Sequence, residues 1–152
     1  MTKERFIKEL GVHGYRYNIQ GDKIIVTHTG SHVNLNHLTS IPPNVVFNNE
    51  MDVDLESIKD IPSGVEFNNR SSLYLSSVTS ISPDVVFHNE WGVDLKSLEE
   101  IPRSIVFNNR GWVDLTYLLG GLDYDWNGNI EGIDEKRLLN KMISLGLFDK
   151  KR

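Results

Sequence analysis

The residues best suited to chemistry lie between Asp123 and Asp134, where the spacing is that of a calcium-binding loop. Side chains with oxygen atoms stand at positions 1, 3 and 5 of such a loop, a glycine follows at position 6, and a carboxylate closes it at position 12. A hard cation needs clustered oxygen ligands on a tight turn. The pattern therefore indicates a candidate Ca²⁺ site with the ligands Asp123, Asp125, Asn127, Asn129 and Asp134.

The same segment also has an interpretation without a metal. Asp, Asn and Gly are frequent in turns because of their backbone geometry, and Asp134 can act as the N-cap of a helix. A paired helix-loop-helix calcium site would have a helix leading into the loop, whereas residues 115–121 still follow the repeat described below. Both interpretations stay open, and the protein requires no cofactor in either.

Other chemistry finds little support in the residues. His28, His32 and His37 have a loose metal-like spacing, but no matching acidic or cysteine cluster accompanies them. The absence of cysteine excludes disulfides, a thiolate nucleophile and a Cys-ligated metal. No Ser-His-Asp order, phosphate-binding glycine loop or pair of catalytic carboxylates stands out. The sequence therefore predicts that the protein is not an enzyme. The alternative of a hydrolase has no candidate catalytic residues.

The larger pattern is a repeat of 20 residues that runs four times through residues 33–112 without an insertion. The blocks begin at Val33, Val53, Leu73 and Val93, and a fifth begins at Val113 and breaks off. A unit this short can bury its apolar side only by stacking on its neighbours. The sequence therefore predicts a single, mainly β, repeat solenoid, a class that exposes long surfaces and usually binds other molecules.

Fixed columns within the blocks predict the path of each coil. Apolar residues spaced by two, as at 33/35 and 45/47, indicate two short strands per coil. An asparagine recurs after the second strand, and this column predicts buried amides that hydrogen-bond either in a ladder or to the backbone of the turn. Its members are Asn49, Asn69, Asn89 and Asn109.

The two ends of the chain differ from the repeat and are expected to cap it. Residues 2–10 indicate an amphipathic helix with Thr2 as its N-cap, and residues 15–26 indicate a hairpin. A second helix is expected over 134–145. The predicted organisation is one structural domain with an N-terminal helix and hairpin cap (1–32), a solenoid (33–118), and a loop with a C-terminal helical cap (119–152).

The repeat order V-x-L-x-x-L-x-x-I-P-x-x-V-x-F-x-N resembles the shortest leucine-rich repeats, the 20-residue bacterial kind. Those repeats place an asparagine soon after the L-x-L strand, whereas here it follows Val-x-Phe. The expected fold is therefore a right-handed leucine-rich-repeat-like or β-helical solenoid. With its helix-hairpin start and the segment 126–148, the chain is also similar to small repeat proteins of bacteriophages. That resemblance implies a host protein as target and inhibition of a bacterial defence or metabolic protein.

Charge limits the class of partner. The net charge of −5, from 21 acidic and 16 basic residues, argues against nucleic acid and favours a protein with a basic surface. No apolar run reaches the length of a membrane span, and the N-terminus is charged rather than signal-like. A cytoplasmic location is therefore expected, which is the cytosol of the bacterial host if the protein comes from a phage.

Residues that point outward between core positions are the candidates for partner binding. The first-strand column is acidic with one tyrosine, the second-strand column holds valines, and tryptophans stand in the turns. A non-catalytic protein-protein interaction module is the expected function. The alternatives are a calcium-stabilised structural repeat and a homo-oligomer formed through the valines. The candidate residues are Asp54, Tyr74, Asp94, Asp114, Val46, Val86, Val106, Trp91 and Trp112.

Overall fold

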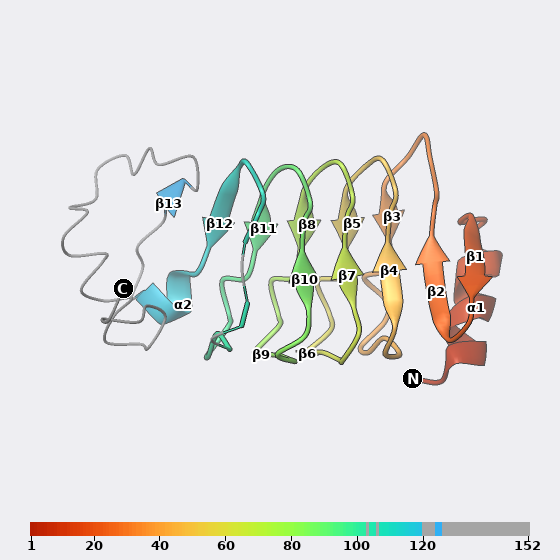
Figure 1. Cartoon of the computed structure of the whole chain (residues 1–152), viewed down its shortest axis with the longest axis horizontal. Helices are drawn as coiled ribbons and strands as arrows, with labels where there is room; N and C mark the ends of the chain where they lie inside the picture. The colour runs from red at the N-terminus through yellow and green to blue at the C-terminus, as the bar shows by residue number, and fades with distance from the viewer. Residues whose placement is uncertain (103, 106, 120–123, 126–152) are drawn as a thin grey trace.

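The computed structural model describes residues 1–102, 104–105, 107–119 and 124–125. It shows a β-solenoid of about four turns (Figure 1). Within the repeat, parallel strands pair each residue with the one 20 positions later, as in the pairs Val33–Val53 and Val53–Leu73. The predicted repeat solenoid is confirmed in this coarse form, and the block length sets the register.

Strands lie on more than one side of each coil. Both predicted strands are present, and in two coils a third strand forms near the middle of the block, which the sequence did not indicate. A leucine-rich repeat would contribute one strand to one sheet, so the observed coils have the β-helical arrangement. One sheet contains β1 (Tyr17–Gln20), β2 (Lys23–Val26), β4 (Val45–Phe47), β7 (Glu66–Phe67) and β10 (Val86–Phe87).

The first strands of the coils form a second sheet, which we call the acidic sheet because aspartates recur along it. Its neighbouring strands are parallel except for the last one, which is antiparallel to β12. The acidic sheet contains β3 (Val33–Asn34), β5 (Val53–Asp54), β8 (Leu73–Tyr74), β11 (Val93–Asp94), β12 (Trp112–Asp114) and β13 (Tyr124–Asp125). A short third sheet contains β6 (Asp60–Ile61) and β9 (Ser80–Ile81). Helix α2 spans Thr116–Leu119.

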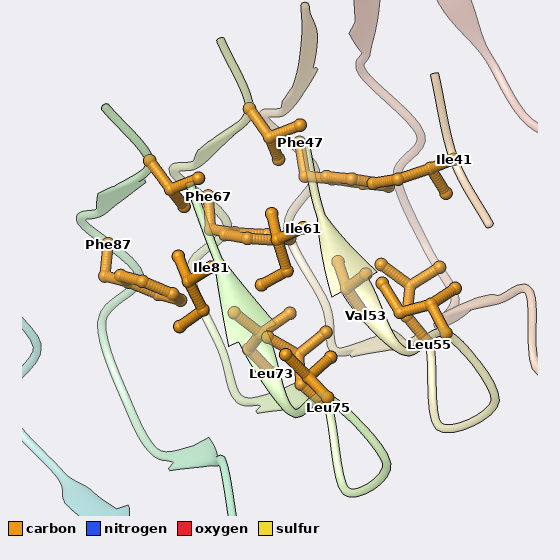
Figure 2. Close-up of a cluster of buried hydrophobic side chains, with 14 of the residues drawn as sticks. Ile41, Phe47, Val53, Leu55, Ile61, Phe67, Leu73, Leu75, Ile81 and Phe87 are labelled. Atoms are coloured by element: carbon orange, nitrogen blue, oxygen red, sulfur yellow. The ribbon is translucent and has the colours of Figure 1, made fainter. Parts of the chain in front are cut away.

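The core consists of the apolar columns seen in the repeat. The phenylalanines form a continuous stack, with ring centroids 5.4 Å apart between Phe47 and Phe67 and between Phe67 and Phe87, and 5.1 Å apart between Phe87 and Phe107. Figure 2 shows the first three of these rings, Phe47, Phe67 and Phe87, beside a column of isoleucines. Since each ring touches the same residue of the next coil, every coil contributes to the burial of its neighbours.

The asparagine column is buried, and its amides bind the backbone of the turns rather than one another. Asn69 is 0% exposed, and its Nδ2 donates to the carbonyl oxygens of Ser71 at 3.1 Å and Ser72 at 3.0 Å and to that of Met51 in the preceding coil at 3.4 Å. Asn89 repeats this arrangement one coil later. Of the two predicted arrangements, the structure has the one in which amides satisfy the turn.

At the N-terminal end of the stack lie helix α1 (Lys3–Val12) and the antiparallel hairpin of β1 and β2 (Figure 1). The hydroxyl of Thr2 accepts a hydrogen bond from the backbone N–H of Arg5 at 3.2 Å, which satisfies a free donor of the first turn. Phe6 and Leu10 are fully buried against the core of the first coil. The helix predicted over 134–145 lies outside the described residues.

Within the described part of the chain, no helix has the length and apolar character needed to cross a membrane.

Candidate functional site

The acidic sheet brings four of the predicted partner-binding residues together. Register pairs Asp54 with Tyr74, Tyr74 with Asp94, and Asp94 with Asp114. Residues in register on parallel strands point to the same face and are about 4.8 Å apart. All four side chains are half-buried. We call this column, together with the neighbouring Asp52, the acidic face.

The electrostatics of the acidic face are visible in two pKa shifts. Burial raises the pKa of the Asp54 carboxyl, and the negative charges of Glu56 and Asp52 raise it further. Burial also raises the pKa of the Tyr74 phenol, with contributions from Asp52, Asp54 and Asp94. In both groups the negative form is disfavoured mainly because the side chain is partly buried, and in addition because other negative charges lie nearby. A cation placed on this face would relieve that repulsion.

The aspartates of the column have different local partners. Asp94 Oδ1 accepts a hydrogen bond from the backbone N–H of Lys96 at 3.1 Å, and its Oδ2 lies 3.6 Å from the Lys96 ammonium. Asp114 Oδ1 accepts from the N–H of Thr116 at 2.9 Å. These two carboxylates close the turn after their strands, as aspartate commonly does.

Asp54 makes no such hydrogen bond in the part of the chain that the structure describes. The corresponding N–H, that of Glu56, donates instead to Asn36 Oδ1 in the preceding coil at 2.8 Å. Asp54 therefore stands among other carboxylates with neither a turn to close nor an ion pair within the described residues. A carboxyl with a raised pKa and no such partner is a candidate functional residue.

We expect Asp54→Asn to raise the unfolding temperature at about pH 7, because a carboxyl with a raised pKa disfavours the folded state once it is ionised. The gain should vanish as the pH falls below about 3.8, the usual value for this group, since the carboxyl is then protonated in both states. Thermal unfolding at the two pH values measures it. Asp94→Asn, which breaks an ion pair with Lys96, is the control and should give no gain. A lower unfolding temperature of Asp54→Asn at neutral pH would contradict this account.

An aromatic side chain borders the acidic face. The ring of Trp112 lies 6.3 Å from that of Tyr74, and its side chain covers Gly92, where an added Cβ would be 2.1 Å from Trp112 Cε2. Glycine at 92 therefore allows the indole to lie flat against the preceding coil. Trp112 stays 39% exposed and Trp91, in the neighbouring turn, 57% exposed. Both tryptophans are thus accessible, and Trp112 forms the edge of the face.

The valine column on the opposite sheet does not form a continuous apolar stripe in the described residues. Val46, Glu66 and Val86 are neighbours in register, and Val106 lies outside the described residues. Lys23 Nζ lies 3.4 Å from Glu66 Oε1. This ion pair joins the two strands that flank β4, and Val46 on β4 is only 6% exposed. Oligomerisation through the valines stays a prediction.

The calcium ligands fall almost entirely outside the described residues. Only Asp125 is included, and its backbone pairs with Trp112 in the antiparallel β12–β13 ladder. Asp123, Asn127, Asn129 and Asp134 lie outside the described residues. The candidate Ca²⁺ site stays a prediction.

The histidines are arranged differently from what their spacing suggested. His28 contacts the hydroxyl of Ser31 at 2.8 Å, and His32 lies 3.2 Å from Asp52. His37 instead meets helix α1, where its Nε2 lies 2.9 Å from Glu9 Oε2, and the same oxygen is 3.9 Å from Nε2 of His13. The sequence interpretation missed this cluster. Its one local signal was a glutamate near the end of the predicted helix with a histidine four residues later, beyond the predicted end at residue 10.

The Glu9 carboxylate of this cluster is held in its charged form. The hydrogen bond with His37 lowers the pKa of Glu9, and the charges of His37, His13 and Arg5 lower it further. An ionised carboxylate beside two imidazoles is a set of donors that can serve either an ion pair or a metal.

Comparison of the chain with protein-family models, with curated proteins and with solved structures finds no match.

Proposed function

We propose that this protein is a non-catalytic binding module and that the acidic face is its binding surface for a basic segment of another protein. The observation that carries the proposal is the ladder of Asp54, Tyr74, Asp94 and Asp114 in register on one sheet. Charges repeated on a rigid β-solenoid attract a basic partner at little cost in ordering the surface.

Arginine is the side chain that this surface suits best. Its planar guanidinium binds a carboxylate through two parallel hydrogen bonds and stacks on aromatic rings. The face offers both, since Tyr74 lies between two aspartates and the Trp112 ring lies 6.3 Å from it. Tyrosine and tryptophan also supply the large rigid contacts that dominate many interfaces. We therefore propose a partner segment rich in arginine.

The resemblance of the repeat to small bacteriophage proteins suggests which partner to seek first. We propose a bacterial host protein, inhibited because the acidic face occupies a basic surface that the host uses for another ligand. A site that normally holds nucleic acid has the required charge.

The test is affinity capture from bacterial lysate, followed by binding measurements on the purified partner. A variant with Asp54→Asn, Asp94→Asn and Asp114→Asn removes three charges. The amides at 94 and 114 keep an oxygen that can close the turn. Its affinity should fall roughly tenfold or more, given up to about 1 kcal/mol for each exposed charge pair.

A matched control removes three charges elsewhere. The variant Glu50→Gln, Glu90→Gln and Glu100→Gln changes exposed residues outside the acidic face and has the same net charge as the aspartate variant. It should retain the partner at the original affinity. Equal weakening by both variants would mean that only net charge matters, and no weakening by the aspartate variant would reject the acidic face as the binding surface.

A further inference from the structure

We infer that Glu9, His13 and His37 form a binding site for a divalent transition-metal ion of the zinc type. None of the three belongs to the acidic face. They join the end of helix α1 to the turn after β3. Glu9 and His37 are 28 residues apart in the sequence.

The distances fit a metal ion after small side-chain shifts. Glu9 Oε2 lies 2.9 Å from Nε2 of His37 and 3.9 Å from Nε2 of His13, and one ligand atom from each of the three residues lies within 4.8 Å of the others. Zinc holds nitrogen and oxygen ligands at about 2.0–2.2 Å, which places tetrahedral ligands roughly 3.3–3.5 Å apart. The observed separations lie on both sides of that value. Closing the site therefore needs rotation of surface side chains and no change in the backbone.

The fold holds the ligands in place before an ion arrives. Glu9 and His13 are four residues apart at the end of α1 and so lie on the same side of the helix. The His13 ring stacks on Tyr15 with centroids 5.8 Å apart and planes at 22°. The hydroxyl of Tyr15 accepts a hydrogen bond from the backbone N–H of Asn34 at 2.9 Å, which anchors this ring to the first coil. Such supporting contacts are what keep metal ligands oriented.

The donor set is one that zinc prefers. Two imidazole nitrogens and one carboxylate oxygen form a three-ligand set, and a fourth position stays open to water or to a side chain of a partner. Without the ion, Glu9 and His37 share a hydrogen bond, and the ion would replace the proton of that bond. Bound metal would then fasten α1 to the first coil. Because the unfolded chain lacks this arrangement, binding would stabilise the folded state.

The test is titration of the full chain, without a polyhistidine tag, with ZnCl₂ by isothermal titration calorimetry, alongside thermal unfolding. We expect one ion per chain at this site and an unfolding temperature that rises with zinc concentration. His13→Ala and His37→Ala should each weaken binding by at least about tenfold, the effect expected even for a lost supporting residue. His88→Ala, which changes an exposed histidine in another coil, should bind zinc like the original chain.

A further variant separates a metal site from an ordinary ion pair. Glu9→Gln keeps a side-chain oxygen within reach of His37 but removes the charge, so the zinc-free chain should stay folded while zinc affinity falls. Circular dichroism without zinc checks that each variant is folded. The inference is overturned if the original chain shows no saturable zinc binding, if binding survives in both histidine variants, or if His88→Ala weakens it equally.

Discussion

Replacing Asn69 by aspartate is expected to lower the free energy of unfolding by about 3–5 kcal/mol, the scale seen when a buried charge is left uncompensated. The side chain is fully buried, and its Nδ2 donates to three carbonyl oxygens. A carboxylate would face those oxygens without a donor and would carry a charge away from water. Urea-induced unfolding at neutral pH measures the loss.

The matched control is Asn48→Asp. Asn48 is the first residue of the equivalent Asn-Asn pair in the preceding coil. It is exposed, so the same chemical change should alter stability by less than about 0.5 kcal/mol. The loss in Asn69→Asp should also become smaller at low pH, because a protonated carboxyl recovers one donor and loses its charge. Equal effects of the two substitutions would show that burial of the amide column does not set its importance.

Replacing Phe67 by alanine is expected to cost about 3–5 kcal/mol, the range for removing a buried aromatic ring from a core. Phe67 is fully buried between Phe47 and Phe87, each 5.4 Å away, so its loss leaves a cavity at the centre of the stack. Two coil interfaces lose contacts at once, because a solenoid is stabilised by contacts between neighbouring units. Chemical unfolding of the variant gives the value.

Two comparisons test this explanation of the Phe67 effect. Phe67→Leu fills most of the space and should cost clearly less than the alanine change. Tyr117→Ala removes an aromatic ring that is 66% exposed and should change stability by less than about 0.5 kcal/mol. A loss in Phe67→Ala no larger than in Tyr117→Ala would mean that the phenylalanine stack does not hold the coils together.

These two substitutions separate the roles of the repeated residues from those of the face that we propose for binding. The phenylalanine and asparagine columns hold the coils in register from the inside and from the turns. Asp54 lies outside that framework, and its replacement by asparagine is expected to stabilise the folded chain at neutral pH while weakening binding of the partner. Opposite effects on stability and binding are the pattern expected of a residue that serves function at some cost to the fold.

Features that depend on the period of the repeat could be predicted from the amino-acid sequence alone. A register of 20 residues, the core columns, two strands in each of the first three coils and the buried position of Asn49, Asn69, Asn89 and Asn109 were all predicted and are observed. The physical reason is that stacked identical units must place identical residues above one another. A local pattern repeated at a constant spacing therefore fixes the long-range contacts as well.

Differences between one coil and the next, and contacts between distant segments, became apparent only in the folded chain. Asp54 and Asp94 occupy the same position of the repeat, yet only Asp94 closes its own turn, because Asn36 takes the equivalent N–H in the first case. His37 meets Glu9 only because α1 packs on the first coil. Such contacts depend on the path of the whole chain and on side chains from neighbouring coils, which the spacing within one block does not encode.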